Sequence, residues 1–133
     1  MMSSMLHLVK AETEYSSTNW FEAETSSGVR YALARMSFGR RLELARLIRE
    51  IARRAEFLEA GQDPREKLEA AVVNSEVDLA YLDWGLLKIE GLTIDGAAAT
   101  PESVIARGPV ALTKEILERI KAESGLSENE RKN

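Results

Sequence analysis

Cysteine is absent from this sequence of 133 residues, histidine occurs once, and aromatic residues make up only 6%. The absence of cysteine excludes a disulfide framework, a thiol nucleophile and thiolate metal ligands. No apolar run approaches the roughly 20 residues that a transmembrane helix needs. Residues 1–10 lack the basic start and the apolar stretch of a signal peptide. We therefore predict a cytoplasmic protein without a membrane span.

Side chains for catalysis or metal binding are also scarce. His7 lies in a polar arm that offers no rigid partner to orient a general base. Carboxylates pair on one predicted helix, Glu66 with Glu69 and Glu76 with Asp83. A carboxylate-bridged metal site in a bundle needs more inward ligands, commonly histidines. No phosphate loop, dinucleotide fingerprint or nucleophile elbow is present. We expect no enzyme activity, no cofactor and no metal.

The N-terminal part is predicted to be an arm followed by a β-hairpin. Residues 1–17 are polar and irregular, which is typical of a flexible arm or an edge strand. Over residues 18–36, two runs of alternating apolar and polar residues flank Ser26-Ser27-Gly28. This pattern predicts a β-hairpin that covers an apolar surface.

Residues 37–91 are predicted to form an antiparallel helical hairpin. Apolar residues recur at steps of three and four over residues 37–60, which predicts the first helix. Asp63 and the proline after it begin a second helix, which we expect to cover residues 64–90. Gly85 weakens the last turn of that helix.

The second helix carries apolar residues on two sides. One stripe consists of Leu68, Val72, Ser75, Leu79, Leu82, Leu86 and Ile89. The other consists of Val73, Val77, Ala80, Trp84 and Leu87. Such a helix is covered on two sides, either by its own chain or by a partner or second copy. For a partner, the predicted contacts are Val73, Val77, Tyr81, Trp84 and Leu87.

Residues 92–133 are predicted to form C-terminal helices after a short extended piece. Turn and capping residues divide this part: Asp95-Gly96, Thr100-Pro101, Pro109 and Gly125. The predicted fold class is α+β and mostly α, with the β-hairpin packed on the helical hairpin. Residues 18–133 form a single domain in this prediction.

The charges are unevenly distributed along the chain. Six arginines and four glutamates give +2 over residues 37–61, while seven acidic and three basic residues give −4 over residues 62–91. Adjacent helices with these charges neutralise each other and leave no single-sign surface for DNA. Arg46, Arg49 and Arg53 still share one side of the first helix. Nucleic-acid contacts through these arginines, in a small DNA-binding regulator, are therefore an alternative.

Three stretches occur in an order that carries a family resemblance. They are residues 35–44 (RMSFGRRLEL), residues 94–96 (IDG) leading into 99–102 (ATPE), and the tail 124–133 (SGLSENERKN). In a small helical protein they resemble phage and prophage proteins of the tail assembly chaperone type. The similarity spans about residues 28–133.

The resemblance implies a non-enzymatic factor in the cytoplasm of a bacterial host. Such chaperones bind the tape-measure protein, a long helical rod, and help tail-tube proteins assemble around it. The expected partner is thus a helical protein that binds through apolar helix surface. Association of the chain into a homo-oligomer is a second option. A structural subunit of a phage particle is a further alternative. The resemblance assigns no residue roles, so the predicted contacts rest on patterning alone.

Overall fold

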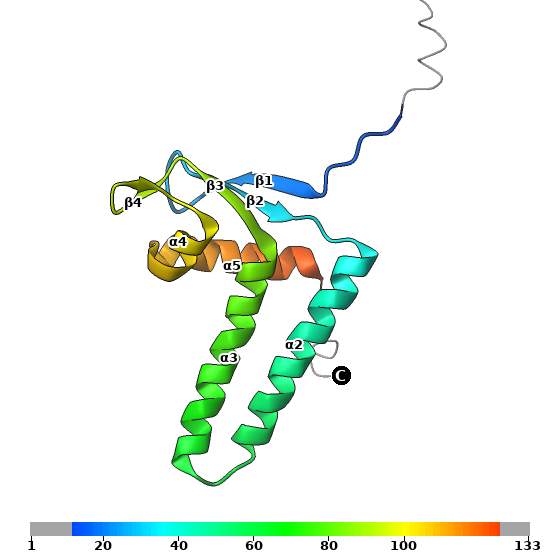
Figure 1. Ribbon diagram of the computed structural model, residues 1–133, viewed down its shortest axis with the longest axis vertical. Helices are drawn as coiled ribbons and strands as arrows, with labels where there is room; N and C mark the ends of the chain where they lie inside the picture. The colour runs from blue at the N-terminus through cyan, green and yellow to red at the C-terminus, as the bar shows by residue number, and fades with distance from the viewer. Residues whose placement is uncertain (1–11, 126–133) are drawn as a thin grey trace, which may run out of the picture.

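A long helical hairpin projects from a body made of a small sheet and two further helices (Figure 1). The computed structural model describes residues 12–125. His7 and the tail that carries part of the family resemblance lie outside these residues. The described part is α+β and mostly helical, as the sequence predicts.

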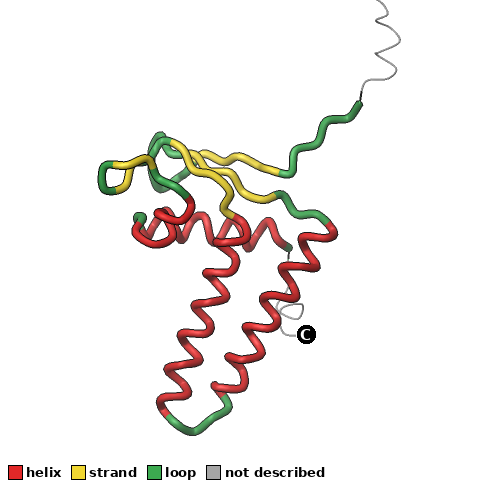
Figure 2. Tube along the Cα trace, in the orientation of Figure 1, coloured by secondary structure: helices red, strands yellow, loops and turns green. Residues whose placement is uncertain are grey.

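The sheet has three antiparallel strands in the order β1-β2-β3 (Figure 2). β1 (Thr18–Glu22) and β2 (Arg30–Ala34) form the predicted β-hairpin. Because β2 is central, four consecutive residues of it, 31–34, are buried. Residues 12–17 contain no strand, so the described part of the N-terminal arm does not form the alternative edge strand.

The projecting hairpin consists of α2 (Phe38–Glu59) and α3 (Pro64–Gly85). α3 begins at the predicted cap Asp63, and α2 begins directly after Ser37, which caps it. The backbone N–H of Arg40 donates to Ser37 Oγ at 3.2 Å, and that of Arg65 donates to Asp63 Oδ1 at 2.9 Å. Each cap satisfies a backbone donor that has no partner inside the helix.

The second helix ends earlier than the sequence predicts. Its continuation to residue 90 is wrong, because β3 (Leu86–Glu90) is a strand paired with β2. This pairing satisfies the backbone groups of an apolar segment and completes the sheet. At Gly85 a Cβ would lie 2.8 Å from Ile120 Cγ2, so the close approach of the C-terminal helix that carries Ile120 requires glycine here.

The C-terminal part follows the predicted capping residues. β4 (Thr93–Ile94) and β5 (Ala97–Ala98) form a small hairpin around the Asp95-Gly96 turn, where both residues have positive φ. α4 (Pro101–Arg107) begins at the predicted Thr100 cap. α5 (Val110–Ser124) ends at Gly125 in the left-handed conformation.

The core lies where the sheet, α5 and the adjoining ends of α2 and α3 meet. α5 packs on one side of α3, where Lys121 Nζ and Asp78 Oδ1 are 3.0 Å apart. The far end of the hairpin extends away from this body (Figure 1). There α2 and α3 pack mainly on each other, so their other sides stay open.

Candidate partner-binding surface

One side of the helical hairpin exposes a row of apolar side chains. Leu68, Val72 and Leu79 are spaced by four and seven residues, so they share one face of α3. Their exposed fractions are 69%, 55% and 43%. Leu47 of α2 is 45% exposed and lines a shallow groove together with Leu79. We call the surface formed by Leu47, Leu68, Val72 and Leu79 the hairpin face.

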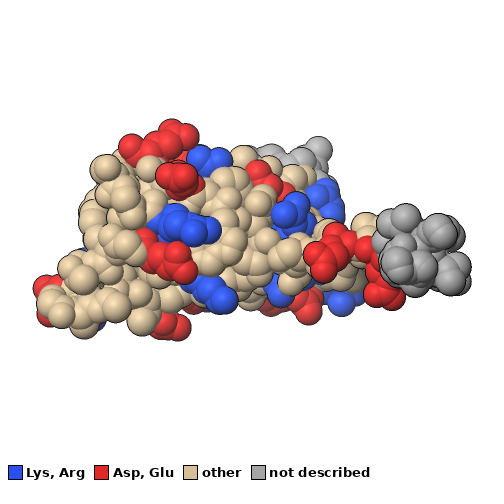
Figure 3. All heavy atoms as spheres, turned by 90° about the horizontal axis from the view of Figure 1, so that it is seen from above, with Lys and Arg blue, Asp and Glu red and all other residues tan. Residues whose placement is uncertain are grey.

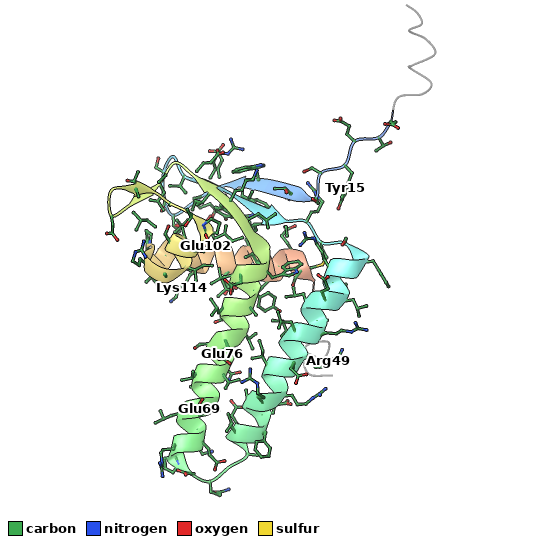
Figure 4. All side chains as sticks on the ribbon, in the orientation of Figure 1. Tyr15, Arg49, Glu69, Glu76, Glu102 and Lys114 are labelled. Atoms are coloured by element: carbon green, nitrogen blue, oxygen red, sulfur yellow. The ribbon has the colours of Figure 1, made fainter. Side chains whose placement is uncertain are left out.

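The groove on the hairpin face runs between the two helices. It is lined by Leu47, Glu50, Ile51 and Arg54 of α2 and by Glu76, Leu79, Ala80, Asp83 and Trp84 of α3. Arg54 Nη2 and Glu76 Oε1 are 3.3 Å apart and bridge the helices; Figure 4 labels Glu76 on α3. Both side chains are about half exposed, so this ion pair adds little stability. A partner can therefore displace the Arg54–Glu76 ion pair at a small cost in free energy.

Trp84 lies at the end of the groove near the body. The guanidinium of Arg40 lies over its ring, 5.7 Å from the centroid. The indole Nε1 is buried and has no hydrogen-bond acceptor among residues 12–125. Trp84 thus combines packing in the core with a place in the groove wall.

The charges along the hairpin face differ between the two helices. From Leu68 to Gly85, α3 carries four acidic residues and no basic one: Glu69, Glu76, Asp78 and Asp83. On α2, Arg53 and Arg54 line a hollow next to the groove, together with Glu50, Phe57 and Leu58. Glu76 and Asp83 therefore give the groove an acidic border on α3, whereas α2 contributes both Arg54 and Glu50. Asp78 lies on another side of α3, where it pairs with Lys121 of α5.

The structure places the predicted contact residues in different environments. Val73 and Tyr81 are buried at 3% and 1% exposure, so no partner reaches them on the folded chain. Val77 and Trp84 are partly buried against the core. Leu87 lies on β3 rather than on the helix, and it is partly buried. The five side chains therefore do not form one exposed stripe.

The exposed apolar residues come mainly from the other predicted stripe. Leu68, Val72 and Leu79 belong to the stripe that the sequence assigned no partner role. Leu47 on α2 was not predicted as a contact. Its spacing of four residues from Ile51, which is buried, was the available signal that it borders the apolar side of α2.

The arginines of the nucleic-acid alternative lie on α2, outside the groove. Arg46 and Arg53 are exposed, while Arg49 is partly buried and its Nε has no hydrogen-bond partner in the described chain. Figure 4 shows Arg49 extending from α2 away from α3. On the face of the body seen in Figure 3, acidic and basic side chains are interspersed. That face has no continuous basic patch of the kind that binds a phosphate backbone.

A carboxylate cluster holds the β1–β2 turn against α5. Glu115 accepts hydrogen bonds from the backbone N–H of Thr25 at 2.9 Å, from Thr25 Oγ1 at 2.7 Å and from the Tyr31 hydroxyl at 2.8 Å. The backbone N–H of Glu24 also donates to it at 3.1 Å. Arg119 Nε donates to the Tyr31 hydroxyl at 3.0 Å.

These contacts shift the pKa values of the acidic groups in opposite directions. Burial and the hydrogen bond to Glu115 raise the pKa of Tyr31 to about 12. For Glu115, burial acts to raise the pKa, but the hydrogen bonds from Thr25, Glu24 and Tyr31 outweigh it, so the pKa is lowered. The cluster therefore keeps Tyr31 protonated and Glu115 ionised, which suits its structural role of attaching the β1–β2 turn to α5.

The described residues contain neither a cluster of metal ligands nor a membrane-spanning helix. Among residues 12–125, no three histidine or carboxylate side chains gather as metal ligands would. No helix in this range has the length and apolarity to cross a membrane. Comparison of the chain with protein-family models, curated proteins and solved structures finds no match.

Proposed function

We propose that this protein is a non-enzymatic assembly chaperone of the phage or prophage tail type, which acts in the cytoplasm of a bacterial host. Its client is a helical, tape-measure-like protein that docks on the hairpin face. The observation that carries the proposal is the row of Leu47, Leu68, Val72 and Leu79, which the described chain leaves uncovered.

The shape of the hairpin suits this role. An amphipathic helix binds in a groove through apolar residues spaced by three, four and seven positions. The hairpin face presents a groove of matching kind between two helices of 22 residues each. Single exposed apolar residues are ordinary, whereas a contiguous row on a projecting element is typical of an interaction site.

Co-expression with a tape-measure protein of a tailed phage tests the proposal. We expect this chain to keep that protein soluble and to elute with it. Leu79→Glu should abolish co-elution, because a carboxylate would have to be buried at the centre of the contact. Val110→Glu is the control, since Val110 is also exposed but lies on α5. Equal co-elution of both variants, or a client that is soluble alone, would contradict the proposal.

One observation favours the nucleic-acid alternative: Arg46, Arg49 and Arg53 make no ion pair within the described residues. The glutamates at positions 43, 50 and 56 interleave with them on α2 and weaken the field that phosphates would meet. A mobility shift of duplex DNA that is lost in Arg46→Ala/Arg53→Ala and at high salt would support the alternative. Absence of a shift at low salt would exclude it.

The structural-subunit alternative predicts a different size in solution. A subunit of a particle should form a ring-sized assembly by itself, whereas a chaperone should remain small without its client. Light scattering of the purified protein separates these two cases.

A further inference from the structure

We infer that the hairpin face is self-complementary and that a second copy of this chain covers it. In the resulting dimer, the two-fold axis runs along the hairpins, and α2 of each copy lies on α3 of the other. This inference concerns the purified protein alone and does not depend on the proposed client.

Leu47 of α2 and Leu79 of α3 lie at similar heights along the hairpin. Leu47 and Leu79 line the same groove, and Arg54 contacts Glu76 within one chain. A rotation about an axis parallel to the helices leaves these heights unchanged and exchanges α2 with α3. It therefore brings Leu47 of one copy to Leu79 of the other.

The charges select this arrangement over the opposite one. With the axis along the hairpins, Arg54 of each copy meets Glu76 of the other, and the four groups alternate in sign around the axis. With the hairpins pointing in opposite directions, α3 would lie on α3. The charged residues that α3 contributes to the groove, Glu76 and Asp83, are both acidic. Opposed like charges cost several kcal/mol and disfavour that packing.

The size of the surface is sufficient for a dimer. A helix of 22 residues is about 33 Å long at the standard rise. Two packed helices are roughly 20 Å wide. Each copy therefore offers about 650 Å², or about 1,300 Å² in total, which lies within the range of specific interfaces. The central ion pairs would fix the register of this contact.

The chain supplies a matched pair of variants on α2. Leu47 and Leu42 are both 45% exposed, but only Leu47 lies on the hairpin face. Sedimentation equilibrium should show a dimer for the wild type and for Leu42→Glu. Leu47→Glu should raise the dissociation constant about 100-fold or more, since each dimer contains the substitution twice.

The absence of cysteine allows the orientation to be measured directly. Gln62 is exposed in the loop at the tip of the hairpin. In Gln62→Cys carrying a spin label, the two tips should lie roughly 20 Å apart if the hairpins are parallel. Tips at opposite ends of the bundle would be separated by about 33 Å or more.

Three results would overturn the inference: a wild type that is monomeric throughout the micromolar range, a Leu47→Glu variant as dimeric as Leu42→Glu, or tips at the longer distance. Circular dichroism should show both variants folded. If Leu47→Glu does not fold, Val72→Glu, at 55% exposure on the other helix, takes its place with the same expected dissociation. A wild-type protein that is monomeric and still binds the client would refute the dimer but not the proposed function.

Discussion

Removal of the Glu115 carboxylate should loosen the attachment of the β1–β2 turn to α5. In Glu115→Ala the donors of Glu24 and Thr25 are exposed, so water replaces the carboxylate there. Tyr31 is fully buried, and its hydroxyl loses its acceptor. An unsatisfied buried donor costs about 1–3 kcal/mol. With the weakened turn contacts, we expect a total loss of about 2–4 kcal/mol in the free energy of unfolding.

Urea unfolding followed by circular dichroism measures this loss, and the midpoint of thermal unfolding should fall by roughly 10 °C. Glu118→Ala is the control, because Glu118 is exposed on the next turn of α5 and should change stability by less than about 0.5 kcal/mol. If Glu115→Ala is no more destabilising than Glu118→Ala, the carboxylate does not pin the turn.

The pH dependence gives a second test of the same cluster. The pKa of Glu115 is lower in the folded protein than in the unfolded chain, where it is about 4.3. Its ionised form therefore stabilises the fold at neutral pH, and this stabilisation is lost as the pH falls through the lowered folded value. The stability difference between wild type and Glu115→Gln should be constant above about pH 5 and shrink in more acidic solution. A difference that stays constant into the acid range would show that the charge plays no part.

Three further substitutions test other parts of the fold. Gly91→Ala should lower the free energy of unfolding in urea by more than about 3 kcal/mol, because its Cβ would collide with the Gly28 carbonyl at a positive φ. Gly96→Ala is the control: this residue also has a positive φ but lies in open space, so the loss should be about 1 kcal/mol. Equal losses would contradict the collision at Gly91. Wild-type stability should fall as the pH rises from about 10 to about 12, since the pKa of Tyr31 is raised to about 12. Tyr31→Phe should remove this part of the alkaline loss of stability. An unchanged pH profile in Tyr31→Phe would show that the loss does not come from Tyr31. Trp84→Phe should change the free energy of unfolding by less than about 1 kcal/mol, because the lost volume is offset by removal of a buried N–H without an acceptor. Trp84→Ala should lower it by about 3–5 kcal/mol. An equally large loss in Trp84→Phe would show that the indole N–H is satisfied.

Local signals in the sequence were sufficient to place the helices. Asp63 and Thr100 cap helices as predicted, because a capping hydrogen bond involves residues only two or three positions apart. The β1–β2 hairpin is equally local, and its strands pair as the alternation indicates. In these elements, neighbours in sequence determine the structure.

The third strand depends on a contact that the sequence does not display. Residues 86–90 have the apolar pattern of a continued helix, yet they pair with β2, more than 50 positions earlier in the chain. The gain from completing the sheet outweighs the helical preference of one turn. Gly85 marked the position of the change but could not indicate that a strand follows.

The sequence shows that the second helix has two apolar stripes, but it does not show which stripe stays exposed. Both apolar stripes of α3 were evident, and helical periodicity gives no indication of which one a neighbour covers. Side-chain size separates several of these residues, while the larger Tyr81 and Leu82 are buried in the core. Ala70, Val73 and Ala80 are buried and are small, which lets two helices approach closely, whereas Leu68 and Leu79 are larger and remain outside.

This division of sizes also explains why the outer stripe should have an occupant. If α3 needed only α2 and the body for its stability, polar residues at positions 68, 72 and 79 would serve as well and would improve solubility. The chain instead keeps branched apolar residues there, on a projecting element that its described residues do not cover. The proposed dimer and the proposed client both require this feature, and they compete for it. Binding of a client should therefore weaken as the concentration of this protein rises wherever the dimer forms, since each copy must leave its dimer before it can bind.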